Sequence, residues 1–200
     1  EPEEKLKMEM RDSAELYYLA ARILTQLGRQ PEATMLTRRA TLHNPSNLSA
    51  WRLWMQLAQS EGNATVLEIC RAMVEANRDE PSVHFELGAL QMAAGQFDDA
   101  AMSMESVVRL APEDPAGYAG LIRVLLASGK HAERALDCSE KLVQLAPLAK
   151  HYDLRAQTLA VSGGMQGAWE NLQRALELEP DNPQYQFAKS QLEKLLGRQP

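Results

Sequence analysis

The sequence is poor in cysteine and contains no long apolar segment. Its two cysteines, Cys70 and Cys138, are too few for a disulfide framework and form no C-x-x-C motif, so we expect both to be small buried residues. No apolar run approaches the roughly 18–20 residues that a helix needs to span a bilayer, so direct membrane insertion is not expected. Basic residues are also in the minority, and the formal net charge is −6. This balance argues against a nucleic-acid partner, because nucleic-acid binders usually carry a basic face.

Signatures of catalysis and of metal binding are missing as well. The four histidines form no i,i+4 pair and have no cysteine nearby at ligand spacing, so no metal site is expected. The sequence contains no phosphate loop, no G-x-S-x-G, no H-E-x-x-H and no dinucleotide fingerprint. The glycine-rich segment 162–167 is expected to be a turn, since no strand precedes it. We therefore expect neither enzymatic activity nor a cofactor.

The sequence leaves open whether a segment precedes residue 1 and in which compartment the protein lies. The first residues, Glu1–Lys5, lack the basic and apolar regions of a signal peptide. Because residue 1 is Glu and not Met, a leader or a further domain upstream of it remains one of the alternatives that we expect. The many Ala, Gln and Leu residues suggest a bacterial source, and the expected location is the cytoplasm or the periplasm.

Glycines recur at a nearly fixed interval along the whole chain. The glycines in this register are residues 28, 62, 95, 129, 163 and 197, at spacings of 34, 33, 34, 34 and 34. Prolines follow four of them by 17 or 18 residues, at positions 45, 112, 147 and 180. The missing proline falls near Arg78 and Asp79. Such a period is typical of repeat architectures, so we expect a chain built from repeated structural units.

The apolar pattern between the glycines and the prolines is helical. Over 81–94 and again over 97–110, apolar residues recur at the three-and-four spacing of an amphipathic helix. Gly95 separates the two segments and can adopt the left-handed conformation that ends a helix. Pro112 stops the second segment. Each unit is therefore expected to be a helix, a short turn, a second helix and a loop.

At this point the residues resemble the tetratricopeptide repeat (TPR) family, whose repeat is 34 residues long. The unit from Pro81 carries the residues that match the family pattern best: Leu87, Gly88, Gly95, Phe97, Ala100, Met104, Val107 and Pro112. The resemblance implies an all-α fold, a right-handed superhelical solenoid of helix-turn-helix repeats. It also implies close packing of the small residues where the two helices of a unit cross, such as Ala21 against Ala33 and Ala156 against Ala168.

The resemblance divides the chain into five repeats with a segment at each end. The expected repeats are residues 14–47, 48–80, 81–114, 115–148 and 149–182. Residues 1–13 are expected to be the remnant of a preceding repeat helix, and residues 183–200 a capping helix with Tyr185, Phe187, Leu192 and Leu195 turned inward. The repeat 48–80 departs most, because Met55 replaces a small residue and no proline stops its second helix. The repeat 115–148 has one residue inserted after its turn.

In the resembled family, first helices line a concave groove that binds partners. Mapped onto this chain, the groove has polar and basic ends and an apolar middle, which suits a peptide with apolar anchors and an acidic group. Phe85 and Met92 are expected to be exposed anchors, and Arg22, Arg52 and Arg123 to bind the acidic group. The residues expected to bind a partner are Tyr18, Arg22, Arg52, Gln56, Phe85, Met92 and Arg123.

Three functions are compatible with these features. The favoured one is a non-catalytic protein-protein interaction scaffold that binds a protein or a peptide segment in the groove, as in an assembly factor of a bacterial complex. The first alternative is a regulatory or substrate-recruiting arm of a larger enzyme. The second is a module that self-associates through unpaired repeat faces.

Overall fold

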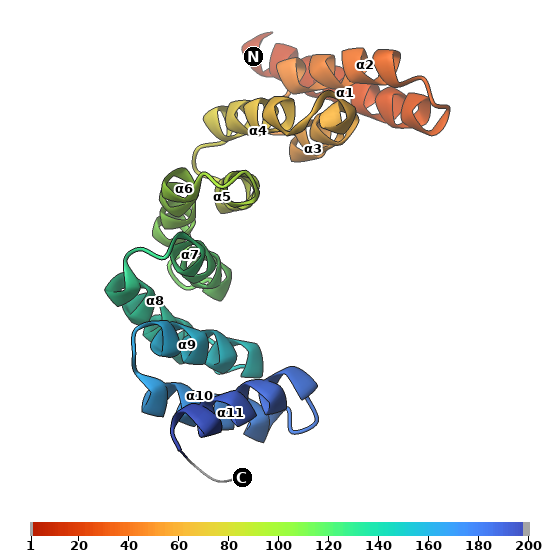
Figure 1. Ribbon diagram of the computed structural model, residues 1–200. Helices are drawn as coiled ribbons and strands as arrows, with labels where there is room; N and C mark the ends of the chain where they lie inside the picture. Colours follow the sequence, from red (N-terminus) through yellow and green to blue (C-terminus); the bar gives the residue numbers. More distant parts are fainter. Residues whose placement is uncertain (1, 198–200) are drawn as a thin grey trace. The chain divides into compact units, whose positions relative to one another are not determined.

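The computed structural model describes residues 2–197, and over this range the chain consists of helices joined by turns and short loops. The all-α class expected from the sequence is confirmed (Figure 1). The helices are α1 (Pro2–Gln26), α2 (Gln30–His43), α3 (Leu48–Leu57), the 3-10 helix η1 (Ala58–Glu61), α4 (Asn63–Ala76), α5 (Pro81–Ala93), α6 (Phe97–Leu110), α7 (Pro115–Ser128), α8 (Ala132–Leu145), α9 (Ala149–Val161), α10 (Met165–Leu178) and α11 (Pro183–Leu195). Residue 1 of the expected N-terminal segment and residues 198–200 of the expected capping segment lie outside the described residues.

The chain divides into two compact units, Glu1–Leu90 and Gln91–Pro200. The boundary falls within α5, so the first turns of this helix belong to the first unit and its end to the second. Each unit is built from antiparallel helix hairpins and has its own buried core. The two units are described separately below.

The first unit contains two hairpins with cores of different composition. In the α1–α2 hairpin, Ala21 and Ala33 are fully buried, as expected for small residues at a helix crossing. The α3–α4 hairpin instead buries large side chains, among them Trp51, Met55 and Met73. The start of α5 completes this second core with Val83 and Leu87.

The hairpin that departs most from the repeat pattern is closed by side-chain hydrogen bonds. Asn77 stands after the last residue of α4, and its Nδ2 donates to the backbone oxygens of Met73 and Pro45, both at 2.9 Å. Trp51 Nε1 donates to the same Pro45 oxygen at 2.8 Å. An orphan carbonyl at a helix end needs such a partner. Asn77 therefore holds the end of α4 in a repeat that lacks the proline found after the other second helices.

The second unit stacks hairpins whose helices approach closely. In the α9–α10 hairpin, Ala156 and Ala168 are buried in one cluster, as the small-residue pattern predicts. In α7, a Cβ placed on Gly117 would lie 3.0 Å from Cγ1 of Val107 in α6, so only glycine fits there without a shift. Leu154 of α9 packs against Ile122 of α7 in a further cluster. These contacts join successive repeats within the unit.

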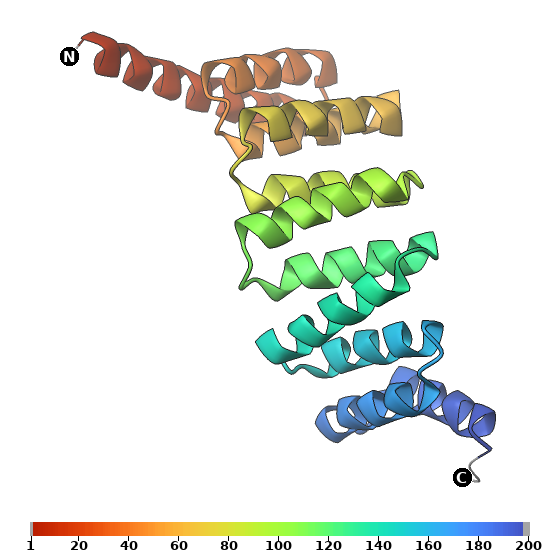
Figure 2. The same cartoon turned by 90° about the vertical axis from the view of Figure 1, so that its left-hand side faces the viewer.

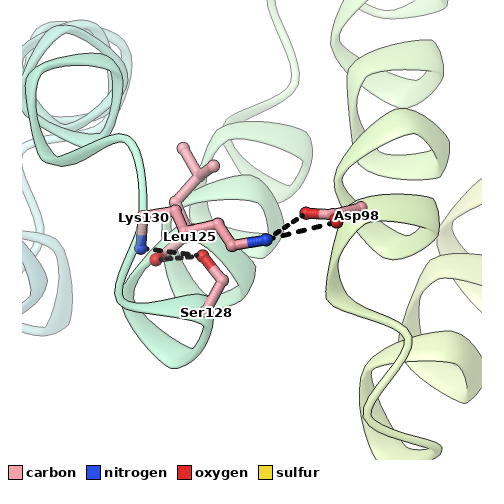
Figure 3. Close-up of polar contacts among 4 residues, drawn as sticks. All are labelled: Asp98, Leu125, Ser128 and Lys130. Atoms are coloured by element: carbon pink, nitrogen blue, oxygen red, sulfur yellow. Dashed lines mark hydrogen bonds and ion pairs between the residues drawn. The ribbon is translucent and has the colours of Figure 1, made fainter.

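The inserted residue expected in repeat 115–148 lies in the turn between α7 and α8. α8 begins three residues after Gly129, whereas α2, α6 and α10 begin two residues after Gly28, Gly95 and Gly163. His131, directly before α8, takes a positive φ of 60° that non-glycine residues rarely adopt. Figure 3 shows how the turn is held: Ser128 Oγ donates to the Leu125 oxygen at 2.8 Å and accepts from the Lys130 amide at 3.2 Å. Lys130 Nζ reaches both carboxylate oxygens of Asp98 at 3.3 Å. The turn is thereby tied to α6.

Both ends of the chain differ from expectation. Residues 2–13 continue into α1 without a break, so the described part of the N-terminal segment is not a separate helix. In α11, Tyr185 is buried and Leu192 packs against the same core. Phe187 and Leu195 were expected to turn inward, but they are 67% and 71% exposed. The helix period puts Tyr185 and Leu192, seven residues apart, on one face and turns Phe187, two residues after Tyr185, away from it. Leu195 is the last residue of α11 and does not belong to that core.

Candidate functional site

A hollow in the first unit lies between α3 and α5. It has a volume of about 340 Å³. Its walls are formed by Arg52, Met55, Gln56, Gln59, Val66, Glu86, Ala89 and Leu90. We call this set the α3–α5 hollow. It is positioned by the core beneath it, because Met55 and Val66 are buried members of the first unit's core and leave only their outer surface to the hollow.

An ion pair closes one side of the α3–α5 hollow. Arg52 Nε donates to Glu86 Oε1 at 2.8 Å, and Nη2 of the same guanidinium is also within hydrogen-bond distance of this oxygen. The hydrogen bond to Glu86 raises the pKa of the Arg52 guanidinium above its ordinary value. The carboxylate thus neutralises the arginine, which was expected to be free to bind an acidic group.

The other walls combine an apolar floor with side-chain amides. Met55, Val66 and Leu90 supply apolar surface, whereas Gln56 and Gln59 are exposed and carry amides. A glutamine amide can donate and accept hydrogen bonds at the same time, as the backbone of an extended peptide requires. The arrangement can therefore hold an apolar side chain on the floor and a peptide backbone at the rim.

Two of the sequence-predicted residues contact each other on α1. Tyr18 is half-buried and Arg22 is exposed, and the Arg22 guanidinium carbon lies 5.8 Å from the centroid of the Tyr18 ring. This is a cation–π distance. These two residues do not line the α3–α5 hollow.

The remaining predicted residues lie on α5 and α7. Phe85 and Met92 are half-buried, whereas the sequence suggested exposed anchors. Their spacing of seven residues puts both on one face of α5. Arg123 is exposed on α7, and no hydrogen bond or ion pair joins it to other residues in the described part of the chain. Of the seven predicted residues, the α3–α5 hollow brings together Arg52 and Gln56 only.

Sequence reasoning did not identify Glu86 as a member of the site. A signal was present, because Glu86 follows Arg52 by 34 residues, which is one repeat period. Residues one period apart on stacked first helices become neighbours, so opposite charges at this spacing predict an ion pair. The same comparison would have predicted a paired arginine.

The buried titratable groups do not resemble a catalytic centre. Burial raises the pKa of the Cys70 thiol to about 12, and it raises the pKa of Cys138 as well. A reactive cysteine has a lowered pKa instead. Burial also raises the pKa of Asp153, while a hydrogen bond from Gln157 opposes the shift. Within residues 2–197 no group of three or more His, Cys, Asp or Glu side chains is arranged to hold a metal ion.

Comparison with solved structures identifies the fold. YrrB, whose structure is described as that of a TPR protein with an unusual peptide-binding site, superposes with a TM-score of 0.69 at 18% identity, over 87% of this chain and 90% of YrrB. MamA gives a TM-score of 0.69 at 16% identity, over 87% of this chain and 96% of MamA. PilF of Pseudomonas aeruginosa gives 0.66 at 18% identity, over 96% of this chain and 86% of PilF. The chain therefore has the TPR fold, as the resemblance implied.

One curated relative is similar in sequence. Cellulose synthase operon protein C of Pseudomonas fluorescens (strain SBW25) is 27% identical over 198 residues. The match covers 92% of this chain but only 15% of the length of that protein. No protein-family model matches the chain. Among the described helices, none combines the length and the apolar character that crossing a membrane requires.

Proposed function

We propose that the chain is a non-catalytic protein-interaction scaffold that binds an extended peptide segment of a partner at the α3–α5 hollow. The observation that carries the proposal is the hollow itself, with its apolar floor of Met55, Val66 and Leu90 below two glutamine amides. Proteins with the TPR fold support an interaction role in general, and the description of YrrB mentions a peptide-binding site.

An apolar side chain of the peptide enters the hollow and supplies most of the binding free energy. Burial of apolar surface contributes about 25 cal/mol per Å², so one large aliphatic side chain suffices as an anchor. Gln56 and Gln59 bind the adjacent peptide backbone. Arg52 stays paired with Glu86, so it does not have to be freed when the peptide binds.

Exposed arginines other than Arg52 then bind the acidic group of the partner. On the first unit we propose Arg22 with Tyr18 for this contact, and on the second unit Arg123 is proposed separately as a residue that binds an acidic group. Phe85 and Met92 present the part of their surface that is not buried as further apolar contacts. The division into repeats 14–47 through 149–182 stays part of the same proposal.

A second proposal rests on the curated relative. Because the chain matches a small part of a cellulose synthase operon protein, we propose as the alternative that it is the repeat region of a larger protein, which recruits components of a bacterial assembly. Co-purification of the full gene product with a synthase or an export complex would favour this alternative.

The test of the leading proposal uses a displayed library of random peptides. Peptides selected on the wild-type chain are measured by fluorescence anisotropy against two variants. Ala89→Trp fills the hollow, and Ala72→Trp adds the same side chain at an exposed position of α4 outside the hollow. We expect Ala89→Trp to weaken binding at least about tenfold, or ~1.4 kcal/mol, and Ala72→Trp to leave it unchanged. Equal peptide affinity of both variants would contradict the proposal that the peptide binds at the α3–α5 hollow.

A further inference from the structure

Helix α2 carries exposed apolar residues between two arginines. Met35 and Leu42 are 49% and 76% exposed, and together with the exposed Pro31 they form a line along the helix, because their spacings are four and seven residues. Arg38 and Arg39 lie on either side of this line, and all five residues border a hollow of about 330 Å³. We call these five residues the α2 outer face.

The opposite side of α2 packs on α1. Ala33, Thr37 and Ala40 are fully buried, and the helix period places them away from Met35 and Leu42. Figure 2 shows α2, in orange, lying along α1 in the first unit. The α2 outer face is therefore not needed for the core of its own hairpin.

The exposure of this face does not depend on where α2 stands in the chain. Counted from the first residue of each second helix, the counterparts of Met35 and Leu42 are Glu68 and Glu75 in α4, Met102 and Arg109 in α6, Asp137 and Gln144 in α8, and Glu170 and Glu177 in α10. All of them are exposed, including those of α8, which has helices before and after it within the second unit. Repeats therefore do not stack on each other by this face.

The two arginines are held by aromatic rings and have no carboxylate partner. The guanidinium carbon of Arg38 lies 5.4 Å from the ring centroid of Trp54 in α3, and that of Arg39 lies 5.9 Å from the ring centroid of Tyr17 in α1. Among residues 2–197 no ion pair neutralises either of them. The cation–π contacts restrict the long side chains beforehand, so less conformational entropy is lost when a partner binds.

The charge of the α2 outer face differs from that of the other second helices. At the six positions that border the hollow, α2 has two arginines and no acidic residue. The acidic residues at the same positions are Glu68 and Glu75 in α4, Asp98 and Glu105 in α6, Glu133, Asp137 and Glu140 in α8, and Glu170 and Glu177 in α10. Each of these four helices has a single basic residue there, so its face is negative. The chain has 27 acidic residues, yet none occurs between Glu32 and Glu61.

This charge distribution selects the kind of molecule that fits the face. An acidic segment is repelled by the outer faces of α4, α6, α8 and α10 and attracted by that of α2, and such complementarity gives specificity. A two-fold contact between copies of this face would instead place arginines against arginines. Because Met35 and Leu42 are apolar, the segment also needs an apolar side chain between its carboxylates.

We propose that the α2 outer face is a second docking surface, which binds an acidic segment of a partner protein. An apolar side chain of the segment lies on Met35 and Leu42, and carboxylates on either side of it pair with Arg38 and Arg39. The proposal goes beyond the peptide site, because the α2 outer face shares no residue with the α3–α5 hollow.

Peptides selected from a displayed random library test this surface. The selection uses the Ala89→Trp variant, in which the α3–α5 hollow is filled, so that peptides for the hollow are not recovered. We expect the enriched peptides to contain an apolar residue with Asp or Glu on both sides. Their dissociation constants, measured by fluorescence anisotropy at low salt, should rise at least about tenfold in R38E/R39E, because attraction is replaced by repulsion.

Matched variants separate the charges from the apolar line. Arg109→Glu reverses an exposed arginine on the same face of α6 and should leave the affinity unchanged. M35Q/L42Q keeps both arginines but removes the apolar line, and it should weaken binding of the same peptides. Circular dichroism checks the fold of each variant, and R38Q/R39Q, which removes the charges without reversing them, replaces R38E/R39E if that variant does not fold.

A methyl signal locates the bound peptide on the wild-type chain. With methyl-labelled methionine, a selected peptide should shift the nuclear magnetic resonance signal of Met35. The signal of Met102, which occupies the corresponding exposed position of α6, should stay in place. Equal shifts of both signals would mean that the peptide adheres to any exposed methionine, which would overturn the proposal.

Two further outcomes would also overturn it. Enriched peptides that lack acidic residues, or that bind R38E/R39E as well as the wild type, would mean that the arginines do not bind a partner. Co-sedimentation with phosphatidylserine vesicles that R38E/R39E abolishes would mean that the face binds a lipid surface. Peptides for the hollow are measured against Ala89→Trp, and R38E/R39E lies outside the hollow, so the two proposals fail independently.

Discussion

The α3–α4 hairpin of the first unit and the α9–α10 hairpin of the second belong to repeats of nearly equal length, with glycine spacings of 33 and 34 residues, but have opposite kinds of core. The first buries large side chains such as Trp51, Met55 and Met73. The second buries small ones such as Ala156, Ala168 and Ala175 around Leu172. Repeats of this kind therefore accommodate a core of large side chains or a core of small ones, provided that hydrogen bonds or a proline fix the ends of the helices.

The hairpin with the large core residues is also the one that contains the proposed peptide-binding site. The small-residue hairpin follows the repeat pattern, whereas the bulky one has Met55 in place of the small residue and lacks the terminal proline, and Asn77 caps its second helix instead. Met55 and Val66 fill the core from below and at the same time form the floor of the α3–α5 hollow. The departure at Met55 thus lies at the site, and the regular hairpin has a close-packed core.

The largest effect is expected from a cavity in the bulky hairpin. Met73→Ala removes a fully buried side chain and should lower the free energy of unfolding by about 2–5 kcal/mol. Chemical denaturation followed by circular dichroism measures the change. Met102→Ala, at an exposed methionine of α6, is the control and should change little. A loss below about 1 kcal/mol for Met73→Ala would show that this hairpin readily collapses around the cavity.

A smaller effect is expected from overpacking the regular hairpin. Ala168→Leu introduces a large side chain where α9 and α10 cross and should destabilise the fold by about 1–3 kcal/mol. The exposed Ala127→Leu in α7 supplies the matched control. If thermal unfolding of the two variants were equal, close packing would not be what the small residues provide.

The helix end of the bulky hairpin gives the next prediction. Asn77→Ala removes two hydrogen bonds to backbone oxygens and should cost about 1–2 kcal/mol, the lower part of the range for two bonds at ~0.5–1.5 kcal/mol each, because the bond to Pro45 is exposed. Hydrogen exchange of the last amides of α4 should accelerate at the same time. Asn63→Ala, at the exposed start of the same helix, tests whether any asparagine in α4 has this effect.

The smallest effect on stability is expected in the turn between α7 and α8 of the second unit. Lys130→Ala breaks an exposed ion pair with Asp98 and should change the unfolding free energy by about 0–1 kcal/mol, a difference that vanishes at high salt. Denaturation at low and at high ionic strength measures it. A large loss that persists in salt would mean that the inserted turn depends on more than this pair.

Most of the fold could be predicted from the sequence because its signals are local and periodic. The glycine register, the proline stops and the three-and-four apolar spacing gave helices over 81–94 and 97–110, which are α5 and α6. The burial of Ala21 against Ala33 followed from the same register. The inserted residue near Lys130 was also visible as a longer spacing before Pro147.

Features that depend on neighbours in space could not be predicted in this way. Asn77 ends α4 through a bond to Pro45, and Glu86 neutralises Arg52, and both contacts join residues about one repeat apart. The partial burial of Phe85 depends on the helices around it, which a single amphipathic pattern does not describe. The orientation of Phe187 in α11 was missed because its apolar residues were assigned to one face without regard to their spacing.

The central claim is that a peptide binds at the α3–α5 hollow, and the methyl groups of the methionines test it most directly. Met55 lies on the floor of the hollow, whereas Met104 is buried in the second unit. With methyl-labelled methionine, addition of a selected peptide should shift the nuclear magnetic resonance signal of Met55 and leave that of Met104 in place. An unchanged Met55 signal at saturating peptide would contradict the claim.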